Sequence, residues 1–322
     1  MSELWTAERT VSLVWAAELI GGQFPELLPL TITLLGEGFD NTVYRVNGRY
    51  VFRFPRRSIA VELLRVECAL LPHLARLQLP LQVSEPVFEG KPTAEYPWPF
   101  AGYRYVAGAL PGRVTAEERI RSSRPLAAFL RRLHGFPVEQ AKRLGVPNDR
   151  IGRLDLSIRL NQADSNMSKA IERGLWSDRH DWDELIAWLD ERAKKSGNGS
   201  GDGIEGGVGN GGAFTEALVH GDLHIRNILV NEERIITGIV DWGDVHTGNP
   251  AADLALVYSY LPPEGRKLFF ADYGEVDVQT RMLARFRAVH TTLFLLLYGN
   301  DRQDAALVEA AQDSLRLALN YP

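Results

Sequence analysis

The 322-residue sequence has one cysteine, no hydrophobic run long enough to span a bilayer and no excess of positive charge. The single cysteine, Cys68, can form neither an internal disulfide bond nor a cysteine-ligated zinc site. It lies in the apolar run 63–71, which favours a small buried side chain over a reactive thiol. The apolar run 291–298 is far shorter than a membrane span. No basic segment precedes an apolar one at the N-terminus, so we expect a cytoplasmic protein without a signal peptide or membrane partner.

The charge balance is slightly acidic. Lys and Arg total 36 and Asp and Glu total 41, which gives a formal charge of −5. Without a basic patch there is no electrostatic basis for binding a phosphate backbone, so we expect no nucleic-acid partner. A chain of 322 residues exceeds the usual limit for a single hydrophobic core, and two packed lobes are therefore expected.

The most informative segment is 220–230, which runs His-Gly-Asp-Leu-His-Ile-Arg-Asn-Ile-Leu-Val. Asp241 follows after a predicted strand pair over 228–240. A carboxylate, an amide five positions later and a second carboxylate suit phosphoryl transfer from a nucleotide. Asp222 would orient the attacking hydroxyl and accept its proton, while Asn227 and Asp241 would bind Mg²⁺. Each residue alone could stabilise a turn, but their combination predicts a kinase.

Three neighbouring residues have expected supporting roles. His220 is expected to brace the loop by hydrogen bonds, because no third ligand completes a metal site with it and His224. Asp253, near the start of an apolar helix, is expected to anchor the loop from below. Asp244 has three open interpretations: it supports the catalytic residues without contacting the substrate, it helps to attract a cationic substrate, or it stabilises a turn.

A glycine-containing loop lies between two predicted strands near the N-terminus. The predicted strands are 30–35, 43–46 and 50–54, the last two joined by Asn47-Gly48, a strong hairpin signal. The loop residues expected to contact a nucleotide are Gly36, Gly38, Phe39 and Asn41. Their spacing follows the kinase glycine-rich loop, with Asn41 at the third glycine position. A strand rather than a helix follows, which favours a flap over nucleotide phosphates and not a Rossmann turn.

Helical periodicity predicts two helices in this region, over 6–20, ended by Gly21-Gly22, and over 58–77. Glu67 lies on the second of these, and Arg53 lies near the end of the strand before it. In kinases a strand cation that contacts the nucleotide phosphates is held by a helix glutamate. Arg53 and Glu67 are the candidates for that pair, although a surface arginine and a solvated glutamate remain the alternative.

The pattern of residues 101–195 predicts a hinge between the lobes, followed by helices. Residues 101–106 form a predicted strand that leads into a glycine, as expected where backbone groups meet a nucleotide base. Helical patterns resume at Thr115 and dominate 155–195. Residues 197–212 include nine glycines, a composition that cannot bury enough apolar surface to offset its ordering entropy, so a flexible insertion is predicted there.

Together these motifs resemble the aminoglycoside phosphotransferase family of antibiotic and small-molecule kinases, over about residues 30–260. The resemblance implies an α+β, bilobal protein-kinase-like fold. A small antiparallel β-sheet N-lobe would comprise residues 1–103, and a larger, mainly helical C-lobe residues 104–322, with the glycine-rich insertion at 197–212. It also implies transfer of the γ-phosphate of ATP or GTP to a small-molecule hydroxyl with Mg²⁺. Gly221 fits this family, whereas Arg53 stands where many members have Lys.

The resemblance also assigns the hinge. The backbone carbonyl of Arg104 and the backbone N–H of Val106 would bind the base, with the Tyr103 side chain at the back of its pocket. A residue as bulky as tyrosine there could disfavour adenine and leave GTP acceptable.

The acceptor is less defined than the donor. Family members that act on aminoglycosides usually present an acidic C-lobe cleft to a polycationic substrate, yet residues 114–195 hold 13 Asp and Glu against 16 Lys and Arg. Asp178, Asp181, Asp183 and Glu184 form one candidate acidic patch. The balance favours a less cationic acceptor, such as a macrolide or a metabolite with one amine.

An antibiotic, with resistance as the role, is favoured over a metabolite such as choline or homoserine. A pseudokinase that binds nucleotide as a scaffold is the alternative from another class, and a protein kinase is the third.

Overall fold

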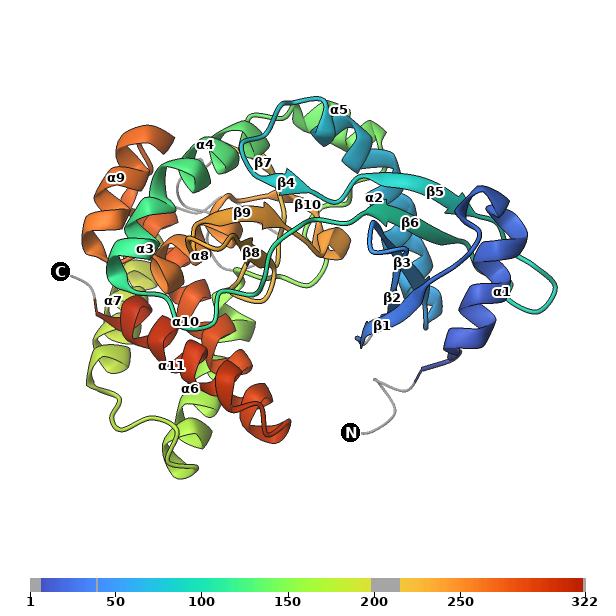
Figure 1. Ribbon diagram of the computed structural model, residues 1–322. Helices are drawn as coiled ribbons and strands as arrows, with labels where there is room; N and C mark the ends of the chain where they lie inside the picture. Colours follow the sequence, from blue (N-terminus) through green and yellow to red (C-terminus); the bar gives the residue numbers. More distant parts are fainter. Residues whose placement is uncertain (1–6, 39, 198–214, 321–322) are drawn as a thin grey trace.

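The N-terminal part of the chain forms an antiparallel sheet of five strands in the spatial order β1-β2-β3-β6-β5 (Figure 1). The strands are β1 (Ile32–Glu37), β2 (Asn41–Val46), β3 (Tyr50–Pro55), β5 (Pro86–Gly90) and β6 (Phe100–Arg104). Asn47 and Gly48 join β2 to β3 with φ of 51° and 65°, the left-handed conformation that a tight hairpin requires. The computed structural model describes residues 7–38, 40–197 and 215–320. Phe39 and the predicted glycine-rich insertion beyond Gly197 therefore lie outside the described residues.

Two helices flank this sheet. They are α1 (Leu13–Gln23), followed by the 3₁₀ turn η1 (Pro25–Leu27), and α2 (Ser58–Ala75). The prediction for α1 was wrong at both ends. Ser12 caps its first turn by accepting a hydrogen bond from the Trp15 amide, and the helix continues through Gly21 and Gly22. Glycine costs a helix about 1 kcal/mol per residue, but Leu19 and Ile20 are buried in the N-lobe core, and this packing outweighs the local preference.

Helix α2 places Cys68 against the core, as expected of a small apolar side chain. Burial raises the pKa of the Cys68 thiol to about 12, so that it stays protonated.

The C-lobe is mostly helical, on the left in Figure 1. Its helices are α3 (Ala116–Arg121), α4 (Ser123–His134), α5 (Val138–Arg143), α6 (Leu156–Glu172), α7 (His180–Gly197), α8 (Ala251–Tyr260), α9 (Pro263–Tyr273), α10 (Val278–Asp301) and α11 (Ala305–Leu319). Helix α10 lies at the centre and contacts α6, α8 and α11. In the part of the chain that the structure describes, no helix has the length and apolarity needed to cross a bilayer.

Short strands between the helices position the residues at the centre of the molecule. They are β4 (Gln82–Val83), β7 (Ala217–Val219), β8 (Ile228–Val230), β9 (Ile236–Ile239) and β10 (His246–Gly248), with the 3₁₀ turn η2 (Trp242–Asp244) after β9. Strands β8 and β9 are the predicted strand pair, and β4 adds to β9 in parallel. The α+β fold with an antiparallel N-lobe and a larger helical C-lobe is thus confirmed. The predicted boundary between residues 103 and 104 falls at the end of β6 and stays a prediction.

Candidate active site

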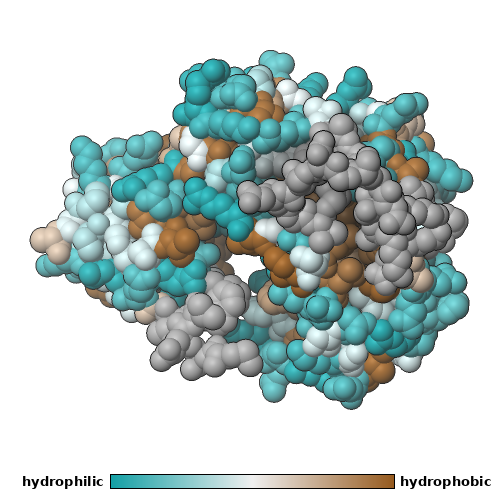
Figure 2. Space-filling view, turned by 180° about the vertical axis from the view of Figure 1, so that it is seen from behind, coloured by the Kyte–Doolittle hydropathy of each residue, from teal (hydrophilic) through white to brown (hydrophobic). Residues whose placement is uncertain are grey.

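The predicted catalytic loop, residues 220–227, joins β7 to β8 between the two lobes. Figure 2 shows the molecule hollowed between these lobes, with hydrophobic atoms bordering the hollow. The loop is anchored by Asp253 of α8, which is fully buried and accepts hydrogen bonds from the backbone amides of His220 at 2.7 Å and Gly221 at 2.8 Å. The expectation that Asp253 holds the loop from below is confirmed.

Gly221 and His220 fix the path of the loop. Gly221 has φ of 86°, and a Cβ atom there would lie 2.3 Å from the backbone oxygen of Asp244, so only glycine fits. The His220 Nε2 lies 3.0 Å from the Val240 carbonyl oxygen, and its ring packs edge-on against Trp242. His220 therefore braces the loop by hydrogen bonding, as expected.

Asp222 projects from this loop with its side chain about one third exposed (32%). Its Oδ2 lies 3.3 Å from the His224 Nε2, and its Oδ1 lies 3.4 Å from an Arg287 Nη2 of α10. Burial acts to raise the pKa of the Asp222 carboxyl, but the neighbouring His224 and Arg287 outweigh it and hold that pKa well below its ordinary value. Asp222 is thus an ionised carboxylate whose side chain remains partly exposed to solvent.

Asn227 and Asp241 lie beside Asp222. The Asn227 Nδ2 donates to the Asp222 carbonyl oxygen at 2.8 Å, and the Val240 amide donates to the Asn227 carbonyl oxygen at 3.0 Å. Asp241 has φ of 66°, uncommon for a residue other than glycine, and its side chain is 56% exposed. The structure thus brings together the three residues that the sequence separates by up to 19 positions.

The donor atoms of this group suit Mg²⁺. Among the described residues, nothing donates a hydrogen bond to the Asn227 Oδ1 or binds the Asp241 Oδ2, which leaves one amide oxygen and one carboxylate oxygen as ligands. Mg²⁺ prefers such oxygen ligands, few in number and completed by water and phosphate oxygens. The residues therefore fit the ion, although their metal-binding role stays a prediction.

Arg53 of β3 links the two lobes. Its Nη1 donates to both Glu67 carboxylate oxygens, at 2.9 and 3.0 Å, and its Nη2 donates to the Asp241 Oδ1 at 2.6 Å. Glu67 is 3% exposed and accepts a further hydrogen bond from the Tyr103 hydroxyl at 2.8 Å. Burial acts to lower the pKa of Arg53, but the two carboxylates outweigh it and raise that pKa, so Arg53 is charged. Arg53 and Glu67 thus form the expected ion pair. A contact of Arg53 with the nucleotide phosphates stays a prediction.

The predicted hinge follows β6. Tyr103 is buried and reaches Glu67, while the Arg104 amide donates to the Glu85 carbonyl oxygen at 2.8 Å. Within the described ranges no group accepts a hydrogen bond from the Val106 amide. This leaves the Val106 amide available for a base, but the roles of Tyr103, Arg104 and Val106 toward a nucleotide stay predictions.

The glycine-containing loop forms the turn between β1 and β2. Gly36 lies within β1, and the Gly38 amide donates to the Asn41 carbonyl oxygen at 3.0 Å, closing the turn. The Asn41 Oδ1 is buried and finds no hydrogen-bond partner among the described residues. This loop lies at the end of the strands next to Arg56, whose Nη1 donates to the Gly38 carbonyl oxygen at 3.0 Å. Contact of Gly36, Gly38 and Asn41 with nucleotide stays a prediction.

Sequence reasoning missed the partners of two acidic residues. Arg287 contacts Asp222, and Arg153 pairs with both Asp244 and Asp149. Asp244 thus shares Arg153 with Asp149, and its role in the site stays a prediction. Arg287 is one of three arginines of α10, with Arg281 and Arg285, and the sequence alone does not single it out or give its partner.

The candidate acidic patch at the start of α7 is also partly neutralised. Arg179 binds Asp183 at 3.0 Å and Asp164 at 2.6 Å, and His180 lies 3.6 Å from Glu184.

Comparison with known proteins bears on this site. The model of a family described as the phosphotransferase enzyme family matches residues 31–289. The uncharacterized protein YcbJ of Bacillus subtilis (strain 168) is 26% identical over 221 residues, which cover 64% of this chain and 61% of that protein. The chain thus spans about three fifths of the length of this relative.

Solved structures are similar over nearly the whole chain. The GDP complex of wild-type aminoglycoside 2′-phosphotransferase-IIIa is 26% identical, with a TM-score of 0.63 over 95% of this chain and 98% of that one. A GDP and kanamycin complex of APH(2″)-IIIa has the same identity and TM-score over 94% and 97% of the two chains. Macrolide 2′-phosphotransferase MphH from Brachybacterium faecium, 23% identical with a TM-score of 0.55 over 94% and 97%, shares the fold.

Proposed function

The chain belongs to the phosphotransferase enzyme family, and from this premise we propose that it transfers the γ-phosphate of ATP or GTP to a hydroxyl group of a small molecule, with Mg²⁺. One observation carries the proposal. Asp222, Asn227 and Asp241 are joined through the hydrogen bonds from Asn227 to the Asp222 backbone and from Val240 to the Asn227 backbone. A proton acceptor and two oxygen ligands in one rigid group are what phosphoryl transfer requires.

Asp222 acts on the acceptor. Its carboxylate accepts a hydrogen bond from the acceptor hydroxyl, orients the oxygen toward the γ-phosphorus and takes up the proton. The bond between this oxygen and phosphorus forms as the bond from phosphorus to the β–γ bridging oxygen breaks, and the electron pair of that bond leaves with the nucleoside diphosphate. His224 and Arg287 keep Asp222 ionised and ready to accept a hydrogen bond.

Arg53, Asn227 and Asp241 act on the donor. Mg²⁺ held by Asn227 and Asp241 would neutralise the charge on the phosphate oxygens. Arg53 would contact the phosphates from the N-lobe side. Glu67 holds Arg53 in place and is itself hydrogen-bonded by the Tyr103 hydroxyl. The GDP complex of a similar structure supports a nucleotide donor.

Two classes of acceptor follow from the sequence. The kanamycin complex of a similar structure supports an antibiotic, whereas the 13 Asp and Glu against 16 Lys and Arg over residues 114–195 favour a less cationic acceptor such as a metabolite. A pseudokinase scaffold is disfavoured, because Asp222, Asn227 and Asp241 are all present and come together.

The test is nucleotide consumption by the purified protein with Mg²⁺ and ATP or GTP, against aminoglycosides, macrolides, amino alcohols and hydroxy acids. Asp222→Ala should lower turnover by about 10²-fold or more, and it should leave nucleotide affinity within about twofold, because Asp222 acts on the acceptor. Asp241→Ala should weaken binding of the Mg²⁺-nucleotide itself.

Asp301→Ala is the matched control, since Asp301 is an exposed carboxylate paired with Arg173 at 2.6 Å. It should change neither quantity. Equal loss of nucleotide binding in Asp222→Ala and Asp241→Ala would show that the two roles are misassigned.

A further inference from the structure

The cleft wall next to Asp222 is rich in arginine. Arg287 comes from α10, Arg159 from the first turn of α6, and Arg153 from the loop before α6. Helices α6 and α10 pack against each other, and Arg287 reaches Asp222. Arg287 therefore lies beside the carboxylate that the acceptor hydroxyl must approach.

Arg287 is nearly buried without a full partner. Its side chain is 11% exposed, and its contact with the Asp222 Oδ1 is 3.4 Å long. A charged pair in good geometry is about 2.7–2.9 Å apart. Within the described part of the chain no other group binds Arg287. Since a buried charge without a close partner is costly, another anion in the cleft would stabilise it.

Among the residues that the structure describes, Arg159 is hydrogen-bonded by neutral oxygens. Its Nε donates to the Gly152 carbonyl oxygen at 3.0 Å, its Nη1 to the Gln162 Oε1 at 2.9 Å, and its Nη2 to the Ile151 carbonyl oxygen. These bonds hold the guanidinium in place but do not neutralise its charge.

The nearby carboxylates are already engaged. Asp149 and Asp244 both bind Arg153, and the Asp155 carboxylate accepts hydrogen bonds from the amide and hydroxyl of Ser157. Asp222 itself is needed for the acceptor hydroxyl. The three arginines and these three carboxylates balance in number, but among the described residues no carboxylate forms an ion pair with Arg159, and Arg287 has only Asp222.

The pKa shifts of Arg287 and His290 are consistent with closely spaced cations at this wall. Burial lowers the pKa of Arg287 below its ordinary value, although Asp222 acts to raise it, and Arg153 and Arg159 lower it further. Burial, with Arg287 and Arg159, lowers the pKa of His290 to about 3, so the imidazole is neutral. The His290 Nδ1 is buried, and no hydrogen-bond partner for it occurs among the residues described. An anion beside these groups would relieve the repulsion.

We propose that the acceptor carries an anionic group, a carboxylate or a phosphate, which Arg287 and Arg159 bind while Asp222 holds the hydroxyl. The proposal rests on the function proposed above. The Arg287 Nη2 and the Asp222 Oδ1 are 3.4 Å apart, and each hydrogen bond to the acceptor adds about 3 Å. The hydroxyl and the anion that they bind are then at most about 9 Å apart, which suits a compact hydroxy acid or phosphate ester. A polycationic aminoglycoside offers no such anion.

The test compares four small hydroxyl compounds that differ in charge: glycerol, choline, glycerate and glycerol 3-phosphate. Each is added to the full chain with saturating Mg²⁺ and ADP, and its dissociation constant is measured from the shift in the unfolding midpoint. Glycerate, glycerol 3-phosphate or both should stabilise the protein, and glycerol and choline should not. Which of the two anions binds more tightly distinguishes a carboxylate site from a phosphate site.

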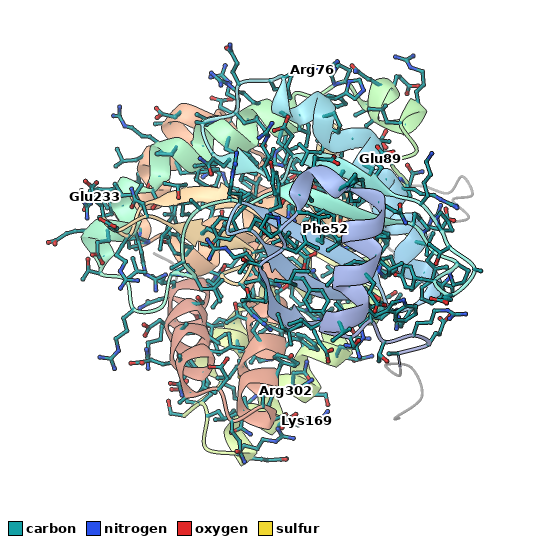
Figure 3. All side chains as sticks on the ribbon, turned by 45° about the vertical axis from the view of Figure 1, so that its right-hand side comes forward. Phe52, Arg76, Glu89, Lys169, Glu233 and Arg302 are labelled. Atoms are coloured by element: carbon teal, nitrogen blue, oxygen red, sulfur yellow. The ribbon has the colours of Figure 1, made fainter. Side chains whose placement is uncertain are left out.

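Three variants test the assignment. Arg159→Gln and Arg287→Gln should each raise the dissociation constant of the anion about tenfold or more, because each removes a charged hydrogen-bond donor. Arg302→Gln is the matched control, since Arg302 follows the same helix α10 but lies at the far end of the C-lobe (Figure 3). It should have no effect.

Several outcomes would overturn the proposal. They are equal stabilisation by glycerol or choline, no stabilisation by either anion, and an anion affinity that survives both Arg159→Gln and Arg287→Gln. If Arg287→Gln lowers kcat for every acceptor and leaves anion affinity unchanged, Arg287 acts on the transferred phosphate instead.

A different result would overturn the phosphotransferase function proposed above. In that case the wild type would not bind the Mg²⁺-nucleotide at all, whatever the added hydroxyl compound. Intact nucleotide binding with turnover only on neutral or cationic acceptors would overturn the anion site alone.

Discussion

The Arg53 Nη2 lies 2.6 Å from the Asp241 Oδ1, although the two residues are 188 positions apart in the chain. The same guanidinium binds Glu67 of α2 through its other terminal nitrogen. A cation of the N-lobe thereby reaches the exposed carboxylate of the C-lobe that is the candidate metal ligand. A lysine ammonium has one nitrogen and cannot bind both carboxylates in this planar arrangement, which gives the arginine at this position a physical reason.

Arg53→Met and Arg53→Lys test this bridge. The methionine variant leaves Glu67 buried without a cation, which should lower the free energy of unfolding by about 3 kcal/mol. It should also weaken binding of the Mg²⁺-nucleotide by about tenfold or more. The lysine variant should lie between it and the wild type in both respects. Calorimetric titration and urea unfolding measure the two effects, with Arg65→Met, which removes an exposed pair with Glu62, as the control. Unchanged nucleotide affinity in Arg53→Met would remove Arg53 from the nucleotide site.

Tyr103 is expected to govern the choice of base by its bulk and to hold Glu67 by its hydroxyl. Tyr103→Phe keeps the bulk and removes the hydrogen bond to Glu67, so the ratio of turnover with ATP to turnover with GTP should stay constant. The loss of that buried bond should lower the free energy of unfolding by about 1–2 kcal/mol. Tyr103→Met should instead raise turnover with ATP relative to GTP. A clear preference for ATP in the wild type that persists in Tyr103→Met would reject the role in base selection.

The residues that the sequence identified share a short motif or a fixed order of elements. Asp222, Asn227 and Asp241 lie within 20 consecutive residues, and the strand pair between them brings them together. The contact of Arg287 with Asp222 spans 65 positions and depends on how α10 packs in the C-lobe. No local pattern encodes such a contact.

The same distinction holds for the fold. The hairpin at Asn47-Gly48 could be predicted because its turn chemistry is local. The course of α1 could not, because burial of Leu19 and Ile20 in the N-lobe core overrides the glycines that follow them.

Gly221 can be tested by adding one methyl group. In Gly221→Ala the new Cβ would lie 2.3 Å from the Asp244 carbonyl oxygen and 2.6 Å from the His246 Nδ1, and φ would remain at 86°. Strain of this kind costs about 1–3 kcal/mol and would displace Asp222, so turnover should fall by about tenfold or more. Gly48→Ala is the control. Its φ of 65° brings similar backbone strain, but no atom lies within 4 Å of the new Cβ, so activity should persist. Equal activity of both variants would show that the loop can shift without harm.

Asp253 should contribute to stability in a pH-dependent way. Burial acts to raise the pKa of its carboxyl, but the hydrogen bond from His134 and the amide of Gly221 outweigh it and lower that pKa in the folded protein. A carboxyl with a lowered folded pKa stabilises the protein fully above its unfolded pKa of about 4, and this contribution is lost as the pH falls through the folded pKa. Wild-type stability should therefore decrease as the pH falls below about 4.

Asp253→Asn isolates this contribution. One carboxamide oxygen cannot replace the two carboxylate oxygens that accept from His220 at 2.7 Å and Gly221 at 2.8 Å, so a buried amide loses its partner. The free energy of unfolding at neutral pH should fall by about 2–3 kcal/mol, and the difference from the wild type should shrink as the pH falls below about 4. Urea unfolding at a series of pH values measures both effects, with Asp313→Asn, whose side chain is 39% exposed, as the control. A difference that stays constant over the whole range would mean that Asp253 acts through packing and not through its charge, and the loop anchor would then be steric.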